Sequence, residues 1–181
     1  MALDHIQQVA TGIGACSVAP MAKLTADTPW SEKFYTLKDS MNITQDPPTK
    51  NEIKVDQLAN AVAVSYESGN FTIEFDIPDI AKEILSEYYT VLETAPTAPA
   101  DKEAIGLKLD NKITKCMLKI DFQTGESLII PNCEMVPSIS ASGLSTAPVN
   151  IHITATALSA LGGDTYEAAD IIFFYKKKVA A

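Results

Sequence analysis

Residues 70–92 read NFTIEFDIPDIAKEILSEYYTVL, and two different periodicities meet in this stretch. From Phe71 to Ile77 apolar and polar residues alternate, which predicts a strand with one buried face. After Pro78 the apolar residues recur at helical spacing, and the fixed φ angle of proline suits the first turn of a helix. The stretch therefore predicts a strand followed directly by an amphipathic helix over about residues 79–92.

Strand-like segments surround this unit on both sides. By residue number they are 13–18, 40–44, 61–66, 106–109, 113–122, 127–136, 148–158 and 170–175. Many short strands with a single convincing helix are typical of layered all-β domains. The predicted fold is therefore mainly β, an antiparallel β-sandwich or barrel with one flanking α-helix.

Turn-forming residues indicate how these strands connect. Glu67–Asn70 predicts a turn that returns 61–66 onto the strand 71–77 as a hairpin. Asp110-Asn111 predicts a second hairpin, which joins 106–109 to 113–122. Thr124-Gly125 predicts a third turn, before the strand that begins at residue 127.

One long connection is different in character. Pro47-Pro48, flanked by polar and charged residues, predicts a long, exposed, polar loop over about residues 45–60. A short strand near Ile53–Val55 is the one regular segment expected there. Loops of this length are usually functional or mobile.

Composition bounds the class of protein. The chain has 181 residues, enough for one domain, of which 46% are hydrophobic and 20% charged. Its 23 acids face 14 bases, all of them lysine, for a net charge of −9. Because the chain has no arginine and is strongly negative, we do not expect it to bind DNA through the phosphates. No apolar run reaches the ~20 residues of a membrane-spanning helix.

Cys16, Cys116 and Cys133 are odd in number and widely spaced, which favours buried thiols in a reducing compartment over a disulfide framework. Residues 1–20 lack the basic and apolar regions of a signal peptide. Residues 13–16 superficially resemble a lipoprotein cleavage box, but the segments that should precede it are missing.

No catalytic constellation is predicted. The polar run with Ser140, Ser142 and Ser145 has no nearby histidine, His5 lies near the terminus, and His152 alternates with polar residues as a face-lining side chain would. Four acids gather around the predicted helix, as its dipole favours: Asp76, Asp79, Glu83 and Glu87. The sequence therefore predicts no catalytic, cofactor-binding or metal-binding residues, and a binding or structural protein rather than an enzyme.

Two passages carry a resemblance to a known family. They are residues 70–89 and residues 115–158, KCMLKIDFQTGESLIIPNCEMVPSISASGLSTAPVNIHITATAL. In both, the order of strands, turns and helix resembles that of the tail tube (major tail) proteins of tailed bacteriophages, whose fold is shared with the tube protein of type VI secretion. The resemblance is one of architecture over most of residues 10–178, without a diagnostic fingerprint.

The resemblance implies a single tail-tube-like domain over residues 1–181, with extended N- and C-terminal arms. It implies a structural virion protein that forms hexameric rings, stacked into a tail tube through which DNA passes without specific binding. Such a tube assembles in the cytoplasm of the bacterial host and meets tape-measure and tail-terminator or baseplate proteins, with no membrane contact. The family also suggests that residues 45–60 reach an adjacent ring.

An alternative is a secreted or lipid-anchored β-sandwich adhesin of fimbrial type. Cys16 and the threonine-rich strands suggest it. A lipid on Cys16, or a signal peptide in a longer precursor, would favour this alternative over a tail tube protein.

Overall fold

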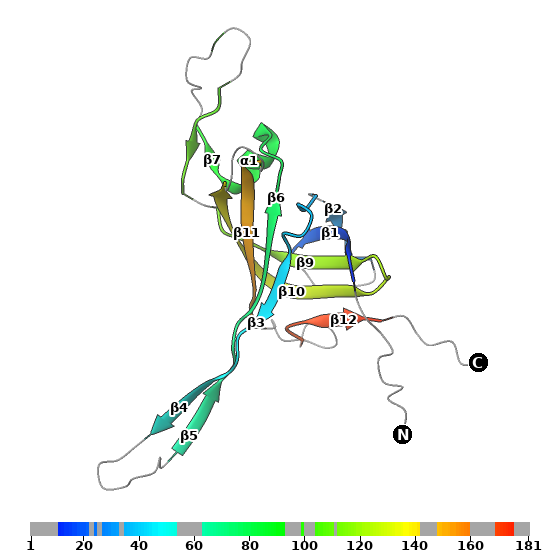
Figure 1. Ribbon diagram of the computed structural model, residues 1–181, viewed down its shortest axis with the longest axis vertical. Helices are drawn as coiled ribbons and strands as arrows, with labels where there is room; N and C mark the ends of the chain where they lie inside the picture. The colour runs from blue at the N-terminus through cyan, green and yellow to red at the C-terminus, as the bar shows by residue number, and fades with distance from the viewer. Residues whose placement is uncertain are drawn as a thin grey trace, which may run out of the picture.

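The fold is described from a computed structural model (Figure 1). The structure describes residues 11–21, 24, 27–32, 35–53, 63–92, 99, 104–110, 112–141, 148–159 and 169–175. Most of both expected terminal arms lies outside these ranges. Strands account for 55% and helix for 6% of the described residues, which confirms a mainly β fold.

Eight strands of the described chain form one antiparallel sheet. In sheet order they are β2 (Ser31–Glu32), β1 (Ile13–Pro20), β9 (Thr114–Phe122), β10 (Ser127–Ser140), β11 (Asn150–Ala157), β6 (Phe71–Ile77) and β3 (Asn42–Gln45), while β12 (Ile172–Phe174) pairs with β10. Among the described strands β2 and β3 end the sheet without meeting, so the fold is a sandwich rather than a closed barrel.

The long strand β10 belongs to both halves of this sandwich. Its first residues pair with β12, whereas Cys133–Ser140 pair with β11. Its pairing with β9 shifts register between Ile130 and Cys133, so that Pro131 and Asn132 form a bulge. Strands on the β1–β9–β12 side consequently run across the direction of β6 and β11, as Figure 1 shows.

Asn132 holds this corner together. Its side-chain Nδ2 donates to the carbonyl oxygen of Ser159 at 2.8 Å. Its own carbonyl oxygen accepts from the N–H of Leu158, also at 2.8 Å. Both contacts fix the end of β11 against the bend of β10.

The main core lies between the two halves. In β6, Ile73, Phe75 and Ile77 are buried and the residues between them are half-buried, which confirms the alternation read from the sequence. β11 shows the same alternation. The other buried side chains of this core are Cys16, Val18, Leu85, Tyr88, Tyr89, Cys116, Leu118, Ile120, Leu128, Ile130, Cys133, Met135, Ile151, Ile153 and Ala155.

A smaller core covers the opposite face of β1, β9 and β10. It consists of Ala19, Leu24, Met117 and Ile129, with Trp30 and Ile172 packed against them. The Nζ atom of Lys119 lies 6.0 Å from the centroid of the Trp30 ring, within the range of a cation–π contact.

The predicted helix is present but shorter than expected. α1 spans Lys82–Tyr88, inside the expected 79–92. Pro78 does not lie in its first turn, because Ala81 is still extended, with ψ 151°. The carboxylate of Asp79 accepts the N–H of Ala81 at 2.8 Å and so supports this extended approach to the helix.

The helix ends early because the following residues form a strand. Tyr89 is extended, and β7 (Thr90–Val91) pairs with β8 (Leu107–Lys108). Thr90 and Val91 are β-branched, which favours extended backbone over helix. The apolar spacing that continues to residue 92 belongs instead to this small pair of strands.

The predicted hairpin between residues 106–109 and 113–122 is therefore wrong. β8 pairs with β7, and Asp110 uses its Oδ1 to accept the N–H of Thr90 at 3.2 Å. The N–H of Lys112 donates to the carbonyl of Tyr88 at 2.9 Å. Asp110 and Lys112 thus continue the contacts of the β7–β8 pair on the side of Tyr88 and Thr90, while Asn111 lies outside the described residues.

The third predicted turn is confirmed. Gly125 has φ 93°, a conformation that favours glycine, and its N–H donates to the carbonyl of Phe122 at 2.9 Å. This turn joins β9 and β10 as an antiparallel hairpin at the centre of the sheet.

Candidate assembly surfaces

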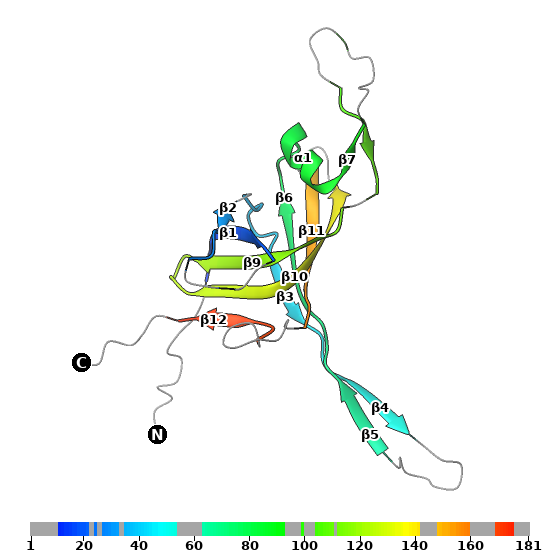
Figure 2. The ribbon, with the colours of Figure 1, turned by 180° about the vertical axis from the view of Figure 1, so that it is seen from behind.

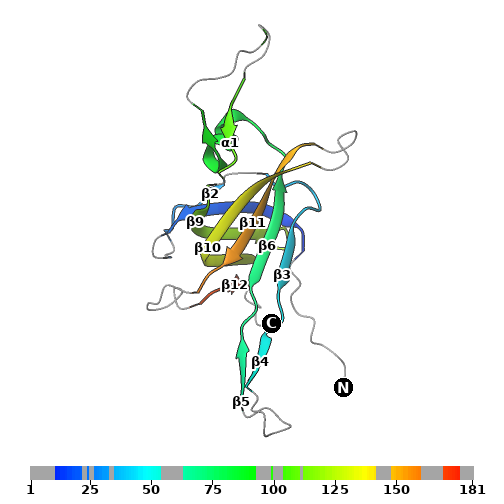
Figure 3. The ribbon, with the colours of Figure 1, turned by 90° about the vertical axis from the view of Figure 1, so that its left-hand side faces the viewer.

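A two-stranded ribbon leaves the sheet at the edge formed by β3 and β6 (Figures 1 and 3). It consists of β4 (Thr49–Ile53) and β5 (Ala63–Glu67), and we call it the arm. Gln45 lies opposite Phe71, and Thr49 lies opposite Glu67, so the same number of residues separates these two pairs on each strand. The β4–β5 pair thus keeps the register of the β3–β6 pair.

This arrangement corrects one prediction and extends another. The described part of the predicted strand 61–66, residues 63–66, does not fold back onto 71–77, since β5 pairs with β4 and runs on into β6. Of the exposed polar loop expected over about 45–60, the described residues 45–53 are exposed, but Thr49–Ile53 among them form a strand. Both faces of this strand meet solvent, so its sequence carries no apolar alternation; residues 54–60 lie outside the described part.

Pairing is interrupted where the arm leaves the sheet. Pro47 and Pro48 have no N–H to donate to a ladder. Just before them, the N–H of Asp46 still donates to the carbonyl of Asn70 at 2.9 Å. The backbone of Gly69 lies directly against that of Asp46. The arm is therefore attached through close backbone contact rather than through side-chain packing.

All the side chains of β4 and β5 are exposed. One face of the arm carries Lys50 and Glu52, which form an ion pair, opposite Tyr66 and Val64. Tyr66 is 66% exposed and Ile53, on the other face, is 62% exposed. An isolated two-stranded hairpin without a core is marginally stable at best in water. The arm is thus a candidate for packing against another molecule.

A second candidate surface is the outer polar face of the sheet. It is formed by the outward residues of β3, β6, β10 and β11, namely Asn42, Thr44, Thr72, Glu74, Asp76, Glu134, Val136, Ser138, His152, Thr154 and Thr156. Within this set the charged residues are three acids and no lysine. Lys115 lies at the margin, opposite Glu134 on the neighbouring strand.

His152 lines this face, as the sequence predicted. Its Nδ1 lies 2.8 Å from Oδ1 of Asp76, directly opposite on β6. The N–H of Asp76 donates to Oγ of Ser40 at 3.1 Å. His152 is thus part of a cross-strand polar contact that orders the face.

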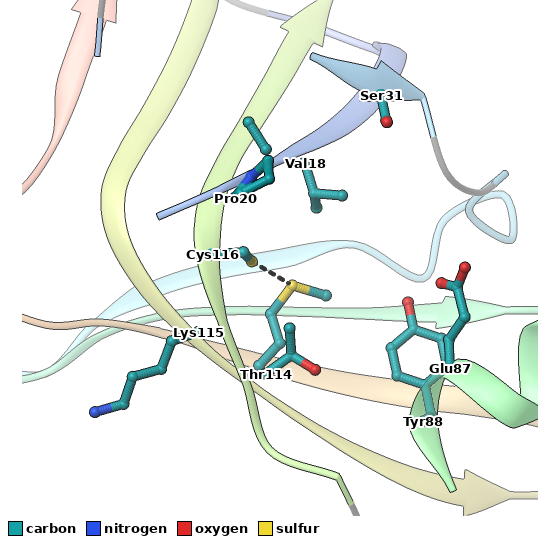
Figure 4. A pocket seen from close by; sticks show the side chains of 10 residues that line it. Val18, Pro20, Ser31, Glu87, Tyr88, Thr114, Lys115 and Cys116 are labelled. Atoms are coloured by element: carbon teal, nitrogen blue, oxygen red, sulfur yellow. Dashed lines mark hydrogen bonds between the residues drawn. The ribbon is translucent and has the colours of Figure 1, made fainter. Parts of the chain in front are cut away.

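A cavity of about 530 Å³ opens between α1 and the ends of β1 and β9 (Figure 4). Val18, Cys116 and Tyr88 line it, and Glu87 stands beside Tyr88 on α1. Burial, and then the charge of Glu87, raises the pKa of Tyr88 above its usual value. The Tyr88 phenol therefore stays protonated at neutral pH and does not supply a base.

The other residues weighed as chemical groups lie apart. Asp76 is on the outer polar face, Asp79 accepts the N–H of Ala81, and Glu83 is exposed in the first turn of α1. Ser140 is half-buried at the end of β10, whereas His5, Ser142 and Ser145 lie outside the described residues. Among the residues that the structure describes, no three His, Cys, Asp or Glu side chains are grouped as metal ligands.

The described part of the chain contains no helix with the length and apolar character to cross a membrane. No protein-family model matches the chain, and no curated protein matches it in sequence.

Proposed function

We propose that this chain is a structural virion protein of the phage tail tube class. It assembles as stacked, hexameric rings into a tube through which DNA passes into the host. The observation that carries the proposal is the arm, in which two strands continue beyond the sheet with every side chain exposed. A segment of this kind gains stability when it packs on a neighbouring subunit.

The outer polar face supports the conduit part of the proposal. Its three acids, Glu74, Asp76 and Glu134, repel phosphates, and its threonines offer neutral hydroxyl groups. A wall with this charge lets DNA pass, whereas a lysine-rich wall would hold it. We assign this face to the lumen of the tube.

The proposed partners follow from the same assignment. Copies of the chain itself form the tube, with tape-measure protein inside it and tail-terminator and baseplate proteins at its ends. The tube is assembled in the cytoplasm of the bacterial host and functions in the virion. The lipid-anchored adhesin would need Cys16 to carry a lipid, but this thiol is buried within β1 opposite Ile120, so lipidation would require β1 to leave the sheet.

Negative-stain microscopy and sedimentation velocity over a range of concentrations test the proposal. We expect rings, or tubes with a central hole, in the unmodified protein. A variant in which an Asn-Gly turn replaces residues 47–69 should remain folded, because the arm residues described between those positions contribute no buried side chain, but should no longer stack.

Leu109→Ser is the matched control. Leu109 is exposed and directly follows β8, whose partner β7 lies at the opposite end of the molecule from the arm (Figure 2). This variant should assemble as the unmodified protein does. A strictly monomeric protein at every concentration would overturn the proposal and leave the adhesin as the better interpretation. Normal tubes from the variant without the arm would show that the arm is not needed for stacking.

A further inference from the structure

Two of the three cysteines lie directly opposite each other in the sheet. Cys116 on β9 is the register partner of Cys133 on β10. Directly opposite residues of antiparallel strands have Cα atoms about 4.5–5.5 Å apart, which falls within the ~4.4–6.8 Å found across disulfides. The register of the two cysteines therefore suits a cross-strand disulfide.

The side chains of this pair also influence each other. The Cys133 thiol is hydrogen-bonded to Cys116, and this bond, followed by burial, raises the pKa of Cys133. The Sγ of Cys116 in turn donates to the Sδ of Met135 at 3.3 Å. Cys133 also adjoins the bulge of β10, where the strand departs from regular pairing.

The cavity gives access to one member of the pair. Cys116 lines the cavity wall between β1 and α1 (Figure 4), whereas Cys133 has 0% exposure and is not among the residues that line it. Cys16 is also buried, but it faces Ile120 and does not line the cavity. The three thiols thus differ in access, although all are buried and reduced.

We propose that Cys116 and Cys133 form a reversible cross-strand disulfide, for which the cavity admits a low-molecular-weight disulfide to Cys116. The site is a modification site independent of the proposed role in a tail tube. In the formed state it joins β9 to β10 beside the corner of the sandwich.

The chemistry is thiol–disulfide exchange in two steps. The Cys116 thiolate attacks one sulfur of oxidised glutathione, so that a mixed disulfide forms and one glutathione thiolate leaves. The Cys133 thiolate then attacks Sγ of Cys116, and the second glutathione leaves. The two protein thiols lose two hydrogens, and oxidised glutathione is reduced to two thiols. Because a raised pKa keeps Cys133 protonated, the second step should accelerate as pH rises.

Tryptic mapping of the unmodified protein tests this directly. Cleavage after lysine places Cys16 in peptide 1–23, Cys116 in 116–119 and Cys133 in 120–176. The folded protein is equilibrated with glutathione mixtures of increasing oxidised fraction, then denatured, alkylated and digested without reduction. We expect 116–119 joined to 120–176, with Cys16 alkylated, and release of both peptides by dithiothreitol.

Two variants test which cysteine reacts with glutathione and which one completes the disulfide. Cys16→Ala should still form the bond, whereas Cys133→Ser should stop at a mixed disulfide on Cys116. If Cys133→Ser fails to fold, the tryptic map of the unmodified protein still shows whether Cys116 and Cys133 are linked. The proposal is overturned if all three cysteines of folded protein are alkylated in the most oxidising mixture, if the mixed disulfide on Cys116 persists in the unmodified protein, or if the linked peptides include Cys16 or a second copy of the chain.

Discussion

The backbone of Gly69 lies so close to Asp46 that a Cβ atom at residue 69 would come within 1.9 Å of the Asp46 carbonyl oxygen. The neighbouring N–H of Asp46 donates to the carbonyl of Asn70. Because the atom that a Cβ would meet belongs to the backbone, no side-chain rotation relieves the clash. The pair determines where the arm leaves the sheet.

Gly69→Ala should therefore misdirect the arm while leaving the core folded. Backbone strain of this kind costs on the order of 1–3 kcal/mol. We expect the concentration needed for assembly to rise at least about tenfold, the equivalent of ~1.4 kcal/mol, as measured by sedimentation. The Asp46 amide of Gly69→Ala should also exchange its hydrogen faster than in the unmodified protein. Ser68→Ala, an exposed neighbour, is the control, and assembly of Gly69→Ala at the unmodified concentration contradicts the assignment.

Tyr66→Ser tests whether the arm packs on another subunit. Tyr66 is exposed in the described chain, so the free energy of unfolding of the monomer should change by no more than about 0.5 kcal/mol. An aromatic anchor that becomes buried in an interface is worth at least ~2 kcal/mol, so assembly should weaken about thirtyfold. Tyr35→Ser makes the same change at an exposed tyrosine outside the arm. Equal effects of the two substitutions on assembly would argue against the arm.

Leu85→Asp should prevent folding, and tube formation with it. Leu85 is 8% exposed and packs in the main core, where an unpaired carboxylate costs about 3–5 kcal/mol. Ile80→Asp introduces the same charge at an exposed position just before α1, and should cost ~0.5 kcal/mol or less. Chemical denaturation monitored by circular dichroism compares the two. A soluble Leu85→Asp protein that forms tubes would refute the packing of α1.

The carboxylate of Asp110, which accepts the N–H of Thr90, should titrate at acid pH and break this contact. The hydrogen bond with Thr90 lowers the pKa of Asp110 below its usual value. The stabilisation from this contact is therefore complete above the unfolded pKa of about 3.9 and is lost as pH falls through the lowered pKa of the folded state. The amide resonance of Thr90, followed by NMR in unassembled protein, should report that inflection.

Asp110→Asn is the control for this titration, because it removes the ionisable group while keeping an oxygen acceptor. The Thr90 inflection should disappear in this variant. An inflection that persists, or one at or above the ordinary pKa of an aspartate, would contradict the contact.

Local periodicity is sufficient where one face of an element is buried. Ile73, Phe75 and Ile77 alternate because β6 has a core on one side only, and the sequence predicts this strand with its boundaries. Gly125 likewise predicts its turn, because glycine readily adopts the positive φ that the turn requires. The arm carries no such signal, because both of its faces are exposed and its pairing rests on main-chain hydrogen bonds that any sequence provides.

The wrong hairpins share one cause. Gly69 and Asp110 are typical turn residues, but each serves an extended pairing here: Gly69 by close approach to Asp46, and Asp110 by accepting the N–H of Thr90. Their partners are distant in sequence, so nothing local distinguishes these roles from a turn. The alternation of the sequence predicts the polar sides of β6 and β11, His152 included, but not that they lie side by side, because that depends on strand order.

The strand order of the sandwich has a consequence for synthesis. β1 pairs with β9, and β6 pairs with β11, so the partners of both early strands are translated much later than they are. A nascent chain that ends before β9 contains no strand of the central β9–β10–β11 meander. We therefore expect the meander to form first, from neighbours along the chain, and the strands that left the ribosome earliest to join the sheet last.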